Sequence, residues 1–351
     1  MPGLGGMTTA SRTRARKPTA DRSPADGPVA GSGSQRVARW GDYGNRFGLL
    51  VAWLILILIF GALEPDSFLS TANFQSILSS QSVLVLLSLS LLPSLMLGGL
   101  DLSVASVLTI SVTIVGWLNV TQGLPIGIAI LCALGAGLLI GLLNALIIVG
   151  LNIDPIVVTL GMGTAVQGAA LGINNVAVSG ISPGLVSAMR TQIFGLQAVF
   201  FYVLVLTTVM WYVLRFTPLG RYMYFSGAGP AVSRLAGIPT RRIHFGSYIF
   251  GGFMAALAGV FLAGVLGSAD PTVGSTYLLP AFAAVFLGAT TITPGRFNPW
   301  GTWISVYFLA TGVTGFEFLG WAGWTREVFY GGALILALVV PRLIGRNARS
   351  V

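Results

Sequence analysis

Long runs of apolar residues alternate along the chain with short polar or glycine-rich stretches. Ten runs are candidate membrane-spanning helices, at 48–63, 81–97, 102–119, 124–149, 155–172, 197–214, 243–268, 276–290, 300–320 and 327–341. Several are shorter than the roughly 20 residues that a helix needs to cross a bilayer, so some are expected to be tilted, broken or re-entrant. The pattern predicts an all-α, polytopic membrane protein with about ten transmembrane helices.

Charged residues are few, and most of the basic ones are grouped. Charged side chains make up 8% of the chain, and three basic blocks lie within 12–46, 215–242 and 342–349, whereas Glu64 and Asp66 follow the first apolar run. Because positively charged loops stay in the cytoplasm, both termini and the 215–242 loop are expected there. Ten crossings satisfy this arrangement, with one before the acidic stretch, five before the basic loop and four after it.

The same pattern divides the chain into three parts. Residues 1–46 are rich in Pro, Gly, Ser and Arg and are predicted to form a disordered basic tail in the cytoplasm. Residues 47–345 form the predicted transmembrane domain, and 346–351 a cytoplasmic C-terminus. The single cysteine, Cys132, lies inside an apolar run, where we expect a buried small residue and no intrachain disulfide.

Several functions are disfavoured by residue types that the chain lacks. The only lysine, Lys17, lies in the tail, so there is no Gly-Lys-Ser/Thr phosphate-binding loop, and if the protein uses ATP to move a solute uphill, another chain must hydrolyse it. The one histidine, His244, has no nucleophile motif or further metal ligands beside it, so no catalytic or metal-binding residue is assigned. The basic blocks are separated by apolar runs, which argues against nucleic-acid binding. A membrane enzyme is disfavoured because the chain shows no nucleophile motif, catalytic base or set of metal ligands.

A nine-residue motif occurs twice, as GGLDLSVAS at 98–106 and as GSADPTVGS at 267–275. Asp101 aligns with Asp270, and Ser103 aligns with Thr272. In the ten-span topology the two copies lie at opposite faces of the membrane, which predicts an inverted repeat of the kind that transporters use for alternating access. Two interpretations of each carboxylate stay open. It accepts hydrogen bonds from amides at a helix start, or it lines a translocation pathway.

Other polar residues inside the apolar runs are candidates for the same pathway. Asn144 and Gln167 are expected to form hydrogen bonds across helices, with contact to a hydroxylated solute as the alternative. Thr159 and Tyr277 complete the pathway candidates, although packing is the commoner role of an aromatic ring.

Five stretches together carry a resemblance to a known family. They are GGLDLSVAS, GLLNALIIVGLNIDPIVVTLGM, GRYMYFSGAGPAVSRLAGI, AALAGV and PTVGSTYLLPAFAAVFLGAT, between about 85 and 340. They resemble the permease subunits of ATP-binding-cassette (ABC) importers for ribose, xylose, arabinose, galactose and similar solutes. The resemblance implies the type II importer fold, with ten helices arranged as in the vitamin B12 importer. It also implies a second permease subunit, identical or related, two cytoplasmic ATPase subunits that bind ATP and Mg, and an extracytoplasmic solute-binding protein.

The resemblance further implies that the 215–242 loop couples the permease to the ATPase. The residues that match the family's loop are Gly220, Arg221, Ala231, Arg234, Ala236, Gly237 and Ile238. Two positions depart from the family's pattern, with Pro230 where an acid is frequent and Val232 where an alanine is common. The residues themselves predict a short helix that begins at Pro230 and ends before Pro239. Its flanking arginines have a second interpretation, as anchors beside lipid phosphates.

These inferences predict the permease subunit of an ABC importer in the inner membrane of a bacterium. It would move a monosaccharide or related small polar solute by alternating access, driven by a partner ATPase and without a cofactor of its own. The alternative is a stand-alone secondary transporter or channel, which needs an ion-coupling constellation. The scattered acids Asp101, Asp154, Asp270, Glu317 and Glu327 offer little evident pairing for that role.

Overall fold

The computed structural model describes residues 32–321 and 323–347, with side chains for 47–321 and 323–339. It divides into two compact units, residues 1–41 and 42–351, and of the first unit only the beginning of helix α1 is described. The described chain is mostly helical. Its α-helices are α1 (Ser32–Leu63), α2 (Pro65–Phe68), α3 (Thr71–Ser80), α4 (Ser82–Met96), α5 (Val104–Gly116), α6 (Ile126–Ala145), α7 (Pro155–Ile173), α8 (Pro183–Arg190), α9 (Ala198–Phe216), α10 (Pro218–Ala228), α11 (Pro230–Leu235), α12 (Thr240–Leu266), α13 (Ser275–Gly288), α14 (Pro299–Phe318) and α15 (Trp324–Asn347). The π-helices η1 (Trp117–Thr121) and η2 (Leu146–Gly150) extend α5 and α6, and the strands are β1 (Val178–Ser179), β2 (Gln192–Ile193), β3 (Leu196–Gln197) and β4 (Ser268–Ala269).

Each of the ten predicted apolar runs falls on a helix. The run at 48–63 is the later part of α1, which begins at Ser32, inside the predicted tail. Extending an existing helix is easier than starting one, because each added residue contributes a hydrogen bond without a new nucleus. Residues 1–31 of the predicted tail, and 348–351 of the predicted C-terminus, lie outside the described residues.

Six helical stretches within the described residues are long and apolar enough to cross a membrane. They are Thr71–Met96, Val104–Thr121, Ile126–Gly150, Pro155–Ile173, Ala198–Phe216 and Thr240–Leu266. Two further apolar helices, Phe47–Leu63 and Ser275–Gly288, are shorter. Helix length and composition thus support six spans, fewer than the ten predicted.

Polar side chains determine where some of these helices begin. Asp154 accepts the amide of Ile156 at 2.8 Å ahead of α7, and Asn298 accepts the amide of Gly301 at 2.6 Å ahead of α14. Each capping residue is followed by a proline, which fits the first helical position because the amide there needs no partner within the helix.

Helix α12 lies at the centre of the core and packs against α4, α5 and α6. Glycines allow the closest approach between these helices. A Cβ at Gly137 of α6 would collide with the side chain of Ala256 on α12 and would lie 2.6 Å from the carbonyl oxygen of Gly252. Close backbone contact of this kind associates helices where lipid surrounds them and no hydrophobic effect drives them together.

Helices α6, α7 and α9 leave most of their surface exposed. Large apolar side chains such as Leu131 and Val205 point outward from them. Cys132 also lies on the exposed side of α6, so the prediction that it is buried was wrong. An apolar run does not distinguish a side that faces lipid from a side that faces the core, because both are apolar.

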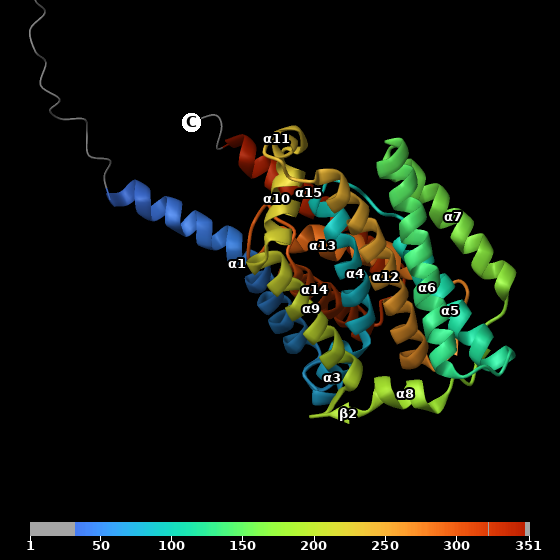
Figure 1. Cartoon of the computed structure of the whole chain (residues 1–351). Coiled ribbons are helices and arrows are strands. Elements are labelled where there is room, and N and C mark those ends of the chain that lie inside the picture. The colour runs from blue at the N-terminus through green and yellow to red at the C-terminus, as the bar shows by residue number, and fades with distance from the viewer. Residues whose placement is uncertain (1–31, 322, 348–351) are drawn as a thin grey trace, which may run out of the picture. The chain divides into compact units, whose positions relative to one another are not determined.

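The bundle has two ends. Helices α10 and α11 lie at the upper end in Figure 1, and α3, α8 and β2 lie at the lower end. At the lower end β2 and β3 pair as an antiparallel hairpin. Strands β1 and β4 also pair, with Val178 opposite Ala269, which joins the segment after α7 to the segment after α12.

Candidate functional site

The first copy of the repeated motif forms a tight turn between α4 and α5. Gly98 has a φ of 82°, a left-handed conformation that glycine adopts without strain. Asp101 Oδ1 then accepts two hydrogen bonds from Ser103, from the backbone N at 3.0 Å and from Oγ at 2.6 Å. The carboxylate therefore organises the turn that leads into α5.

Two neighbouring helices hold this turn, called the first turn below (residues 98–103), in place. Asn144 of α6 donates from Nδ2 to Ser103 Oγ at 2.9 Å. Thr159 of α7 accepts the amide of Leu102 at 3.1 Å, and its hydroxyl lies 3.2 Å from the carbonyl oxygen of Leu100. The side chains of Asp101, Ser103, Asn144 and Thr159 are all buried. Four of the six pathway candidates thus form one buried polar cluster.

The second copy forms the same kind of turn between α12 and α13. Gly267 has a φ of 67°. Asp270 Oδ1 accepts from Thr272, from the backbone N at 2.8 Å and from Oγ1 at 2.7 Å. Gln167 of α7 donates from Nε2 to the carbonyl oxygen of Pro271 at 2.7 Å. Asn144 and Gln167 therefore bond to other segments of the chain, as expected, but their partners lie in the two turns and not on neighbouring helices.

The hydrogen bonds of Asp101 and Asp270 refine the capping interpretation. Each carboxylate accepts the amide of the residue two positions later, and that residue lies in the turn ahead of the helix. Helix α5 begins at Val104 and α13 begins at Ser275. The acids therefore order the turns that precede the two helices and do not cap the helices themselves.

The first turn runs back into the helix bundle. A Cβ at Gly251 of α12 would lie 3.9 Å from Asp101 Oδ2 and 3.2 Å from the carbonyl oxygen of Ser90. Ser90 lies about 9 Å before Met96 along α4, at 1.5 Å per residue. The chain therefore reverses after the end of α4, and Asp101 lies level with the middle of that helix.

The second turn also runs back into the bundle, along α5. A Cβ at Gly116, at the end of α5, would collide with Ala269. A Cβ at Gly274 would collide with the carbonyl of Ala105, at the beginning of the same helix. Helix α13 thus begins deep inside the bundle, and its 14 residues extend only about 21 Å. Tyr277, in the first turn of α13, is half-buried and lies outside the cluster around Asp101.

The 215–242 loop folds into two helices, α10 and the short α11. The predicted helix is present as α11, which begins at Pro230 and ends before Gly237, with a φ of 77° at that glycine. Sequence reasoning missed α10. Its sequence, PLGRYMYFSGA, mixes polar and aromatic residues and has two glycines, so no apolar run marks it.

Helix α11 presents apolar side chains to its surroundings. Leu235 is 90% exposed and Val232 is 71% exposed. Of the residues matched to the family's loop, Arg221, Ala231, Arg234, Ala236 and Gly237 are exposed and Ile238 is half-buried. Gly220 is buried, because a Cβ there would collide with the backbone of Leu214 at the end of α9. Gly220 therefore shapes the junction of α9 and α10.

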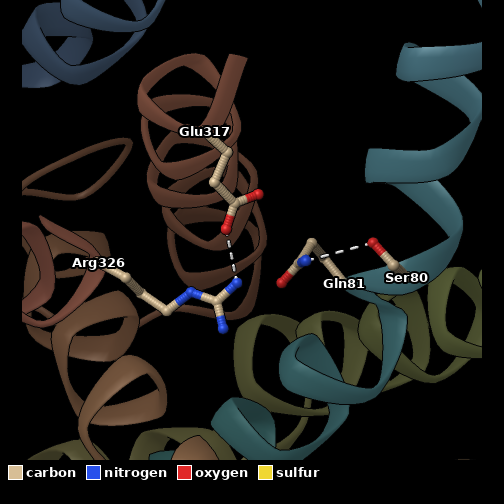
Figure 2. Close-up of polar contacts among 4 residues, drawn as sticks. All are labelled: Ser80, Gln81, Glu317 and Arg326. Atoms are coloured by element: carbon tan, nitrogen blue, oxygen red, sulfur yellow. Dashed lines mark hydrogen bonds and ion pairs between the residues drawn. The ribbon is translucent and has the colours of Figure 1, made fainter. Parts of the chain in front are cut away.

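An ion pair that the sequence did not reveal joins α14 to α15. Arg326 Nη2 lies 2.7 Å from Glu317 Oε1, and both side chains are about half exposed. Figure 2 shows this pair together with Gln81, whose amide faces it and donates to Ser80 Oγ at 3.2 Å. Glu317 was among the acids without evident pairing. The short connection between α14 and α15 brings Arg326 close to Glu317. Predicting where the two helices end and begin is the sequence signal that could have indicated this pair.

The chemistry of these residues favours binding over catalysis. Within the described residues, no three His, Cys, Asp or Glu side chains are grouped to hold a metal ion. The polar cluster contains hydroxyls, an amide and a carboxylate, and their hydrogen bonds to one another and to the backbone hold the turn together. Asn144 Oδ1 is buried without a hydrogen-bond partner among the described residues.

Comparison with known proteins gives a consistent result. Residues 73–338 match the family described as branched-chain amino acid transport system / permease component. The ribose import permease of Haemophilus influenzae is 32% identical over 266 residues, which cover 72% of this chain and 80% of the relative. The fructose import permease of Rhizobium meliloti is 29% identical, covering 70% and 71% of the two chains. The D-allose transport system permease of Escherichia coli strain K12 is 27% identical, covering 88% and 93%. No solved structure matches the chain.

The match spans the two repeated turns, both loop helices and most of the apolar helices, so it covers the features described above. The chain is a multi-pass membrane protein, and ATP hydrolysis belongs to a separate subunit. It belongs to the branched-chain amino acid transport system / permease component family and is the membrane permease of an ABC importer.

Proposed function

We propose that the permease imports a monosaccharide or a similarly small, neutral, hydroxylated solute. Relatives that match most of the chain are named for ribose, fructose and D-allose. The residues at the two turns are mainly hydroxyls and amides, as in Ser103, Asn144 and Thr272, which suit hydroxyl groups better than they suit a strongly charged solute. Asp101, Ser103, Asn144, Thr159, Asp270 and Tyr277 remain the pathway candidates.

The energy comes from an ATPase that docks on α11. The observation that carries this proposal is the exposure of Leu235 and Val232 on a six-residue helix at one end of the bundle. Two large apolar side chains held in water are costly unless a partner covers them. Ala231, Ala236 and Gly237 flank them with small side chains that leave room for a partner's groove.

The proposed topology has ten crossings, with α11 and both termini in the cytoplasm and the membrane being the bacterial inner membrane. The basic residues of the 215–242 loop support this orientation. A solute-binding protein then delivers the solute at the end that carries α3 and α8, and a second permease subunit completes the importer. Alternation between the two ends exposes the turn at Asp270 to the outside and the turn at Asp101 to the inside.

Replacing Ala231 with Trp tests the docking helix. Ala231 is exposed, so the indole does not disturb the core, but it occupies the space that a partner needs. We expect the variant to insert normally and to lose co-purification with the ATPase. Gly237 is a less suitable target, because its φ of 77° strains any other residue.

The matched control is Leu160→Trp, which adds the same ring to the exposed side of α7, where Leu160 is 58% exposed. It should keep the ATPase. Normal co-purification of Ala231→Trp would remove α11 as the docking site. Uptake of tritiated ribose by the assembled importer, competed with unlabelled fructose and D-allose, then tests the solute class.

A further inference from the structure

Helix α10 rests directly on the end of α4. A Cβ at Gly227 would collide with the carbonyl oxygen of Met96 and would lie 3.5 Å from the Cα of Leu97. The obstacle is backbone, so no side-chain rotation relieves it. Only glycine at position 227 allows α10 to approach the end of α4 this closely.

A small apolar cluster surrounds this contact. Leu97, Met223 of α10 and Ile243 of α12 are buried together, and Met96 and Ile238 pack against them. Leu97 begins the connection that carries Asp101. Packed side chains and backbone therefore connect α10 to the first turn.

A second contact joins α10 to the later half of the chain. The guanidinium of Arg296, between α13 and α14, lies 3.9 Å from the centre of the Tyr224 ring on α10. Both groups are exposed, so water weakens this cation–π contact. Helix α10 thus touches α4 through a rigid backbone contact and the α13–α14 connection through a weaker one.

We propose that Gly227 is a positioning residue for transport, and that α10 carries the movement of α11 to the end of α4 and so to the turn at Asp101. The inference rests on the proposed function, since it takes α11 as the helix that the ATPase moves. It adds a residue that the partner does not touch, because Gly227 faces α4.

The test compares Gly227→Ala with Gly229→Ala in the same loop. A Cβ at Gly229 comes no closer than 3.8 Å to any atom, and its φ of −161° suits any residue. Both variants carry Cys132→Ser and a half-buried reporter, Leu102→Cys, in the turn that carries Asp101. The full-length chain, assembled with its ATPase in proteoliposomes, is labelled with a membrane-impermeant maleimide with and without ATP.

We expect ATP to change the labelling rate of the Gly229→Ala protein by about fivefold or more, a typical coupling between distant sites. The ATPase should still co-purify with the Gly227→Ala protein and hydrolyse ATP, but ATP should no longer change the labelling rate. An equal response in both variants overturns the proposal. Loss of the ATPase from Gly227→Ala but not from Gly229→Ala would show that Gly227 acts on docking and would also overturn the proposal, whereas the docking on α11 is tested separately by Ala231→Trp.

If the Gly227→Ala protein does not accumulate, a disulfide cross-link tests whether α10 and the end of α4 move together. Leu97→Cys and Met223→Cys, with Cys132→Ser, place two thiols in the buried cluster. If α10 and the end of α4 move together, the oxidised pair should keep the ATP response of the Leu102→Cys reporter. Loss of that response on oxidation, restored by a reductant, would show that the two helices move apart and would refute the proposal.

Discussion

The turns at Asp101 and Asp270 share a local structure and differ in their surroundings. Each begins with a left-handed glycine, and in each an aspartate accepts the backbone N and the hydroxyl of the residue two positions later. Asp101 is only 2% exposed, whereas Asp270 is half-buried. Nine similar residues therefore specify the turn, and the helices packed around it specify how closed it is.

Helix α7 contacts both turns. Thr159 bonds the backbone of the first turn, and Gln167 bonds the backbone of the second, about 12 Å further along the helix. The first turn has additional support from Asn144, and the second from its pairing with β1. The comparison teaches that α7 links the two turns and that the first is more deeply buried.

The largest loss of stability is expected from a change at the contact between the two copies of the nine-residue motif. In Gly274→Val the new side chain meets the backbone of Ala105 and the hydroxyl of Thr109, so α13 must move away from α5. Overpacking of this kind costs about 3 kcal/mol when the obstacle cannot move. We expect a lower thermal unfolding midpoint in detergent and loss of transport.

The control for this change is Gly161→Val on α7, where a Cβ meets nothing within 4 Å. It should unfold at nearly the wild-type temperature. A Gly274→Val protein with wild-type stability would mean that α13 does not press on α5, and the two copies would then not meet inside the bundle.

Removing either hydrogen bond from α7 to a turn should lower the stability by less, and the loss should differ between the two turns. Thr159→Val keeps the shape of the side chain but leaves the half-buried amide of Leu102 without its acceptor, which costs about 1 kcal/mol. Gln167→Met removes a donor from the carbonyl of Pro271, a milder loss because a carbonyl tolerates reduced bonding better than an amide does. Thermal unfolding of both variants measures the difference. Equal destabilisation, or a larger loss from Gln167→Met, would contradict the greater cost expected for the bond to the first turn.

The sequence predicted the helices well, because apolar runs, capping acids and prolines are local signals. All ten runs are helical, and α11 begins at Pro230 as expected. It missed α10 and α8, whose mixed polar sequences carry no long apolar run. The burial prediction for Cys132 failed, since lipid-facing and core-facing positions are equally apolar.

The candidate site was predictable only in part. The repeat identified Asp101 and Asp270 because their spacing to Ser103 and Thr272 is visible in the chain. The collection of Asn144 and Thr159 around the first turn depends on how α6 and α7 pack, which no local pattern records. The contact of Gly227 with Met96 joins residues far apart in the chain and was also not visible there.

Sided labelling tests the central claim, that the two turns serve opposite faces of the membrane. In a Cys132→Ser background, Asp101→Cys and Asp270→Cys are treated with a membrane-impermeant maleimide on intact cells and on inverted vesicles. We expect Asp270→Cys to react only from outside, and Asp101→Cys to react only from inside and more slowly because that position is buried. Reaction of both cysteines from the same face would contradict the account.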